Sequence, residues 1–170
     1  MSLVSLTTFS IMPGRTAAFR AAFAQAAEQH PAHGLARFLV EIGEVNTLLC
    51  IADLATLDDL PRHSAWASDL HRRQAAVLRT TQIDTFDRAD GAAVADLRAL
   101  AVRAVLLEDI AAGGDNAADA QAVTLNALTG ALGRRLRLTP FQTMDAALNA
   151  AMTRRAGGQN DRNALLIPEA

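Results

Sequence analysis

Three side chains in one stretch of the sequence are of types that could do chemistry together: Arg37, Glu41 and Cys50. They lie in two apolar segments, 35–42 and 47–54. An arginine can hold an anion, a carboxylate can act as a general base, and a cysteine becomes a nucleophile when a positive neighbour lowers its pKa. We therefore predict these three as ligand-binding residues, and we assign no catalytic residue.

The two segments predict a β-hairpin. Both are rich in Leu, Ile, Val and Phe, and Gly and Asn bound the turn at 43–46. A symmetric turn pairs Ile42 with Thr47, so Arg37 opposes Ala52 and alternation places the three candidates on one face. The opposite face, which we expect to pack against helices, carries Ala36, Phe38, Val40, Ile42, Leu49 and Ile51.

Each candidate also has a purely structural interpretation. Arg37 and Glu41 can form an ion pair at a barrel rim or a subunit contact, since buried charges are costly unless they are paired. Cys50 lies in an apolar run, where a cysteine usually serves as a small buried hydrophobic residue. A structure with an enclosed cavity touching Arg37 and Glu41 would favour the ligand-binding interpretation.

The histidines give no metal site by spacing. His30 and His33 fall on a loop without a neighbouring carboxylate or cysteine, and we expect no metal there. His63 and His71 are eight residues apart on a predicted helix, and we expect both at the surface. No serine has a nucleophile-elbow context and no glycine-rich phosphate loop follows a strand, so we predict no metal and no cofactor.

Composition limits the partners. A net charge of −2 and a pI near 6.0 provide no basic field for nucleic acid. The sequence shows no signal peptide and no apolar run long enough to span a bilayer, so we expect a cytoplasmic protein without a membrane or nucleic-acid partner. We expect the arginine groups to be solvated at helix ends or strand edges: Arg72-Arg73, Arg134-Arg135-Arg137 and Arg154-Arg155.

The first half predicts a ferredoxin-like β-α-β-β-α-β module in the α+β class. Its elements are a strand at 3–11, a helix at 15–29, the hairpin, a helix from Thr56 to about Arg79, and a strand at 82–86. Phe19 and Phe23 of the first helix and Trp66 and Leu70 of the second are expected to pack on Phe38, Val40 and Leu49. We take residues 1–89 as this module and 90–170 as a second unit.

The second unit has two interpretations, an unrelated α/β extension or a degenerate repeat of the first module. Residues 97–110 could be strand or helix. The remaining elements are predicted as a helix at 116–132, an edge strand at 134–141, a helix at 144–155 capped by Thr143, and a strand at 163–168.

The first half resembles the NIPSNAP family of dimeric α/β-barrel proteins over about residues 3–88. The matching features are Pro13-Gly14-Arg15, Glu41-Ile42-Gly43, Asn46, Leu57-Asp58-Asp59 and Trp66, in that order. The resemblance implies a ferredoxin-like module whose sheets pair face to face into a barrel. Family members commonly carry a His and a Trp in the third strand, where this chain has Cys50 and Ala52.

The face with Leu39, Leu48 and Cys50 would be open in a single layer, so it needs a cover. We predict a homodimer through this face, and cover by residues 97–167 is the alternative. The predicted function is a self-associating NIPSNAP-like barrel protein that binds a small apolar metabolite. The alternative is a cofactor-free oxygenase or isomerase with a hydrophobic substrate inside the barrel, and we therefore leave open whether the chain is an enzyme.

Overall fold

A computed structural model of the chain describes residues 3–30, 34–42, 44–88, 103–110, 122–129, 133–156 and 163–168. The first half contains β1 (Leu3–Ile11), α1 (Thr16–Ala27), β2 (Gly34–Ile42), β3 (Thr47–Leu54), the 3₁₀ turn η1 (Leu57–Asp59), α2 (Leu60–Arg73) and β4 (Leu78–Arg88). The second half contains β5 (Ala104–Ile110), β6 (Val123–Ala127), β7 (Arg135–Phe141), α4 (Met144–Ala156) and β8 (Asn163–Pro168). The predicted β-α-β-β-α-β order of the first half is confirmed.

Several predicted boundaries are wrong. The second helix ends at Arg73 rather than near Arg79, and β4 starts at Leu78 because it pairs with β1 along nearly its whole length. Within the predicted helix at 116–132, the described part contains strand β6, which pairs with β7 and β4. Pairing on both sides overrides the helical preference of this segment. Residues 104–110 are the strand β5, and 97–102 lie outside the described residues.

The eight strands of the described residues form a closed barrel in the order β1-β3-β2-β8-β5-β7-β6-β4. All the recorded pairs are antiparallel. Both halves have the same internal strand order, β4-β1-β3-β2 in the first half and β8-β5-β7-β6 in the second. In each half the fourth strand pairs with the first, the first with the third, and the third with the second. The second half therefore supplies the sheet that the first half lacks, and the barrel closes within one chain. The strand β7, predicted at an edge, lies between β5 and β6.

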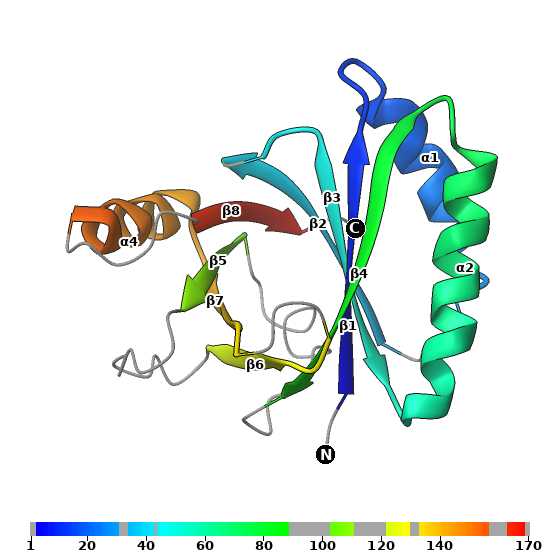
Figure 1. The fold of residues 1–170 in the computed structure, drawn as a ribbon. Coiled ribbons are helices and arrows are strands. Elements are labelled where there is room, and N and C mark those ends of the chain that lie inside the picture. Colours follow the sequence, from blue (N-terminus) through cyan, green and yellow to red (C-terminus); the bar gives the residue numbers. More distant parts are fainter. Residues whose placement is uncertain are drawn as a thin grey trace.

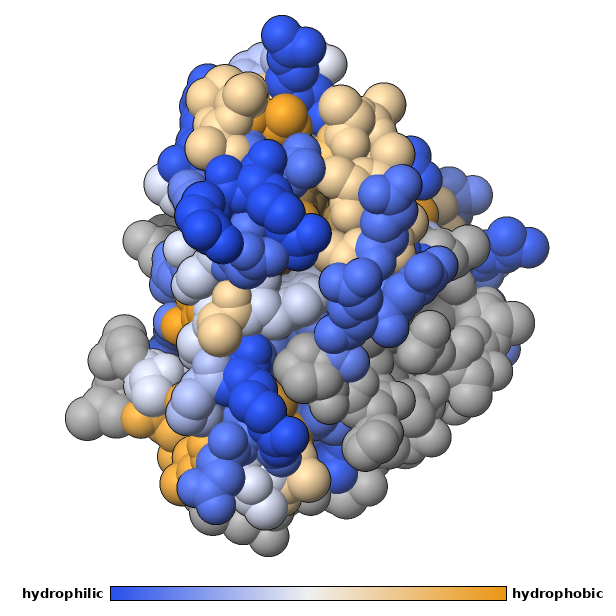
Figure 2. Space-filling view, turned by 90° about the vertical axis from the view of Figure 1, so that its right-hand side faces the viewer, coloured by the Kyte–Doolittle hydropathy of each residue, from blue (hydrophilic) through white to orange (hydrophobic). Residues whose placement is uncertain are grey.

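The helices cover the barrel from outside. Figure 1 shows α1 and α2 on one side of the sheet formed by β1 to β4, and α4 beyond β5 and β8 on the other side. Hydrophilic side chains cover much of the surface on the α1 and α2 side, with smaller apolar areas between them (Figure 2). None of the helices in the described ranges has the length and apolar content needed to cross a membrane.

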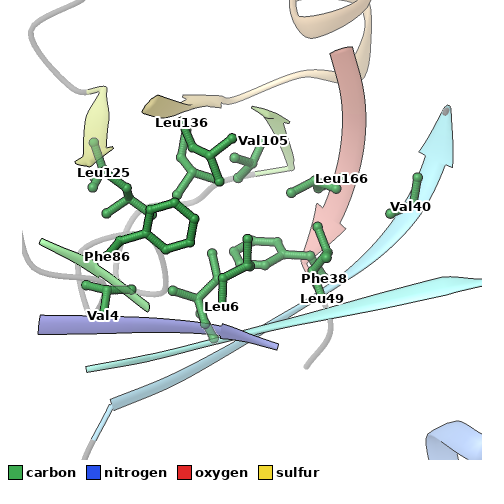
Figure 3. Close-up of a cluster of buried hydrophobic side chains, with 14 residues drawn as sticks. Val4, Leu6, Phe38, Val40, Leu49, Phe86, Val105, Leu125, Leu136 and Leu166 are labelled. Atoms are coloured by element: carbon green, nitrogen blue, oxygen red, sulfur yellow. The ribbon is translucent and has the colours of Figure 1, made fainter. Parts of the chain in front are cut away.

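Side chains from both halves fill the barrel. Figure 3 shows Phe38 and Phe86 pointing into the centre, with Leu125 and Leu136 from the second half around them. The cluster comprises Val4, Leu6, Ala36, Phe38, Val40, Leu49, Ile51, Phe86, Val105, Val123, Leu125, Leu136, Leu138 and Leu166, and each is at most 8% exposed. The barrel interior is thus a packed core, as is expected of a barrel with about eight strands.

The prediction of which hairpin face meets the helices is wrong. Phe38, Val40 and Leu49 point into the barrel, whereas Leu48 and Cys50 lie beneath the helices. Both faces are apolar, so alternation groups the residues correctly but does not tell which group the helices cover. The pairing is also shifted by two residues, with Arg37 opposite Cys50 rather than Ala52.

A second core lies between the helices and the sheet. Phe9 of β1 is at the centre of this core. The centroid of its ring lies 5.3 Å from that of Phe19 and 5.6 Å from that of Phe23. Trp66 and Leu70 of α2 join the same cluster. The four predicted helix residues are therefore buried as expected, but they contact the opposite face of the hairpin.

Candidate functional site

Of the predicted site residues, Arg37 and Cys50 lie outside the barrel interior. Arg37 and Cys50 face each other on β2 and β3, in the layer between the sheet and α1. The Cζ atom of Arg37 lies 6.0 Å from the centre of the Phe23 ring, close enough for a cation–π contact. The side chain of Glu41 lies outside the described part of the structure. Two of the three residues are thus adjacent, but in the helix layer rather than in the barrel.

Cys50 has the character of a structural residue. It is fully buried. Burial raises the pKa of its thiol far above its usual range, and the charge of Arg37 offsets only part of this increase. Because the thiolate is the nucleophilic form, Cys50 is inert at neutral pH.

The polar centre of this layer is a line of three side chains that includes His63. The Nε2 atom of His63 lies 2.8 Å from Thr7 Oγ1, and its Nδ1 atom lies 2.9 Å from His30 Nε2. His63 and Thr7 are both 0% exposed, so the predicted surface position of His63 is wrong. Burial, together with the nearby His30, lowers the pKa of His63 to about 4. His63 is therefore neutral at physiological pH.

Trp66 fixes this line between the two helices. Its Nε1–H donates to the carbonyl oxygen of Ala26 at 2.9 Å, close to the end of α1. Its ring lies 4.4 Å from the ring of His30 and 5.8 Å from that of His63. The end of α1, the middle of α2 and strand β1 are thereby held together by hydrogen bonds and ring contacts.

The order Thr7, His63 and His30 has the geometry of a nucleophile, a base and an orienting group. A nucleophile must reach a substrate, however, and Thr7 lies fully buried under the helices. A base whose pKa is near 4 also has little capacity to take a proton at neutral pH. The three side chains therefore have a structural role: they connect strand β1 to the two helices, and each hydrogen-bonds to its neighbour in the line.

The sequence carries a signal for the burial of His63 that the spacing of the histidines alone does not reveal. His63 lies three residues before Trp66, which places both on one helix face. That face continues through Ala67 and Leu70, and all four residues are buried. Thr7 has no comparable signal, because its partner comes from a helix that is 56 residues away in the chain.

The second half has its own buried polar cluster, beneath α4. Glu108 and Arg137 have side chains that are 1% and 7% exposed, and Arg137 Nε lies 2.9 Å from Glu108 Oε2. Arg154 of α4 pairs with the same carboxylate oxygen. The expectation that Arg137 is solvated is therefore wrong. Such a pair is costly to break, because removal of one partner leaves a buried charge.

A further ion pair joins the two halves. The Nε atom of Arg134 lies 2.9 Å from Asp109 Oδ2, and its Nη1 atom lies 3.8 Å from Asp84 Oδ2. Gln82 donates to the same oxygen of Asp84 at 2.9 Å. Arg134 thus bridges carboxylates from β4 and β5.

An open pocket of about 230 Å³ lies between α2 and β4, lined by Ser68, His71, Thr81 and Ile83. The Nδ1 atom of His71 lies 2.8 Å from Thr81 Oγ1, which fixes the imidazole ring. His71 is partly buried rather than fully at the surface. In the described parts of the chain, no group of three or more His, Cys, Asp or Glu side chains could hold a metal ion.

Some solved structures of similar fold match this chain over 99% of its length. A putative chlorite dismutase is similar over 99% of this chain and 95% of its own, with a TM-score of 0.66 and 10% identity. An anthrone oxidase-like protein is similar over 99% of this chain and 92% of its own, with a TM-score of 0.63 and 11% identity. At such identities the likeness shows the fold alone. The chain therefore has the same α+β fold as these solved structures.

The chain is also structurally similar to NIPSNAP family proteins. One from Agrobacterium tumefaciens is similar over 54% of this chain and 97% of its own, with 16% identity and a TM-score of 0.45. No family model matches the sequence, and no curated protein matches it either.

Proposed function

We propose that this chain is a self-associating, non-catalytic barrel protein whose interior is a structural core rather than a substrate chamber. The observation that carries the proposal is the packing of the barrel by the core residues around Phe38 and Phe86. A small apolar metabolite inside the barrel would have to displace this packing. The alternative, an oxygenase or isomerase with its substrate there, lacks support for the same reason.

Self-association needs another surface than the one predicted from the sequence. Leu48 and Cys50 are covered by the chain's own helices, and the opposite face of the hairpin is covered by the second half. The outer side of α4 offers an alternative. Leu148 and Met152 are 37% and 63% exposed and lie one helical turn apart. We assign the contact between copies to this side of α4.

Sedimentation equilibrium on the full chain tests this proposal. We expect a dimer that the double variant Leu148→Asp, Met152→Asp converts to monomer, because two carboxylates on the contact oppose its burial. The matched control is Val45→Asp, which places a carboxylate at a hairpin position that is 59% exposed. A wild-type chain that stays monomeric, or a dimer that both variants leave intact, would contradict the assignment.

A further inference from the structure

Among the described residues, one edge of β4 has no neighbouring strand over part of its length. The strand pairs with β1 from Leu78 to Asp87, but it pairs with β6 only from Phe86 to Arg88. The backbone of Leu128 reaches Thr85, and no described strand lies beside Arg79–Ile83 on that side. Among the described strands, this stretch is therefore a sheet edge.

The edge has few of the features that usually protect such a strand. Natural edges carry lysines, prolines, inward charges or bulges that prevent pairing with another chain. Arg79 places an exposed charge at one end of the stretch, whereas residues 80–83 (Thr-Thr-Gln-Ile) hold no charge and no proline, and Thr80 and Gln82 are exposed. The register shift between β1 and β4 falls at Arg79, because Ser10 pairs with Thr80 and Ile11 with Leu78. Residues 80–83 lie beyond this irregularity. The stretch is thus suited to accept an additional strand.

The pocket lined by Ser68, His71, Thr81 and Ile83 lies beside this edge. Two of its lining residues, Thr81 and Ile83, come from the edge stretch itself. Its volume of about 230 Å³ is large enough to take one side chain. A free edge beside a side-chain pocket is the arrangement by which sheets capture extended peptides, since the backbone gives affinity and the pocket gives specificity.

In one tautomer of His71, the pocket offers hydrogen-bond donors to a ligand. When Thr81 donates to Nδ1 of His71, the Nε2 atom carries the proton and can donate to a ligand. The hydroxyl of Ser68 is a further donor. We propose that β4 binds an extended peptide segment along Arg79–Ile83, with an acidic side chain of the peptide in this pocket.

The test uses blocked synthetic peptides of about seven residues that alternate valine and threonine, with glutamate or lysine at the centre. Peptide titration of the full-length protein is followed by backbone amide shifts. We expect the glutamate peptide to shift the amides of Arg79–Ile83 and the lysine peptide to bind at least about fivefold more weakly, as expected for lost hydrogen bonds.

Two Thr→Val variants on neighbouring positions provide the control. Thr81→Val should weaken binding about fivefold because it removes a pocket hydroxyl, and His71→Gln should do the same. Thr80→Val makes the same chemical change at a residue outside the pocket lining and should leave the affinity within about twofold. The Leu148→Asp, Met152→Asp variant should bind unchanged, which separates this site from the proposed α4 contact.

Three results would overturn the proposal. The first is equal binding of the glutamate and lysine peptides, and the second is binding that neither Thr81→Val nor His71→Gln affects. The third is a shift of the Arg79–Ile83 amides on dilution of the protein alone, which would assign the edge to a second copy of the chain.

Discussion

At the scale of single residues, polar groups are buried in lines and clusters rather than around a chamber. His63 lies between Thr7 and His30, and Glu108 accepts from Arg137. Each arrangement holds a helix against the sheet. We therefore expect substitutions in both to change the stability of the fold rather than a turnover rate.

The neutral state of His63 predicts a pH-dependent stability. Its pKa is about 4 in the folded chain and near 6.5 when unfolded, so the unfolded state takes up the proton first as pH falls. The contribution of His63 is complete above pH 6.5 and is lost as the pH falls towards 4. Between pH 8 and pH 5 this amounts to about 2 kcal/mol of unfolding free energy.

Urea unfolding of His63→Gln across this pH range measures the effect. At pH 8 the variant should be less stable by about 1–3 kcal/mol, because Thr7 and His30 lose their buried partner. The difference in unfolding free energy between wild type and variant should narrow as the pH falls to 5. The wild type loses stability when His63 is protonated in its unfolded state, and the variant has no imidazole at this position. Val45→Ala, which changes an exposed turn residue without a titratable group, is the control, and its stability difference from the wild type should stay constant with pH. A wild-type-to-His63→Gln gap that is constant with pH would refute this role of His63.

At the scale of elements, most of the strands and helices follow from local patterns. The stripe of apolar residues in α1 and the hairpin of β2 and β3 were predicted, and Thr56 N–H donates to Asp59 Oδ2 at 3.0 Å as the capping pattern indicated. The orientation of the hairpin was not predictable, because seven of the eight residues of β3 are buried. Strand β6 was missed because its five residues lie in a segment whose apolar spacing fits a helix, and one of its two pairing partners, β4, is remote in the sequence.

The orientation of the hairpin predicts the cost of removing Phe38. This side chain is 1% exposed in the barrel core, so Phe38→Ala should lower the unfolding free energy by about 3–5 kcal/mol. Val45→Ala, at an exposed position in the turn, should change it by less than about 0.5 kcal/mol. Chemical denaturation of both variants at one pH provides the comparison. A loss below about 1 kcal/mol for Phe38→Ala would place the side chain outside the core.

At the scale of the whole molecule, the second half covers the first sheet, where the sequence predicted a partner subunit. The sequence raised this possibility through the spacing of its glycines and apolar runs, but it showed no second hairpin. The hairpin exists as β6 and β7, with the loop between them partly outside the described residues. Arg37 and Cys50 could not be placed from sequence, since both faces of the hairpin are apolar and the two residues were assigned to the barrel side of the sheet.

A fragment that ends at Arg88 should self-associate. It would leave Phe38, Leu49 and Ile51 without the apolar side chains of the second half, and such a patch generally drives association. Light scattering should show oligomers of the fragment, and the dye ANS should bind it more strongly than the full chain. Phe38→Asp in the same fragment should reduce the association. A fragment that is monomeric and does not bind the dye would contradict the packing.

The position of β8 has a consequence for synthesis. This strand lies between β2 and β5, and it pairs Leu166 with Val40, so the barrel closes only when residues far apart in the chain meet. At about 5–20 residues per second, the 80 residues between Arg88 and Pro168 take roughly 4–16 s to translate. During that interval the apolar face of the first sheet has no native cover. We therefore expect chaperones to bind the nascent chain mainly during this interval, and to be released once β8 pairs with β2 and β5.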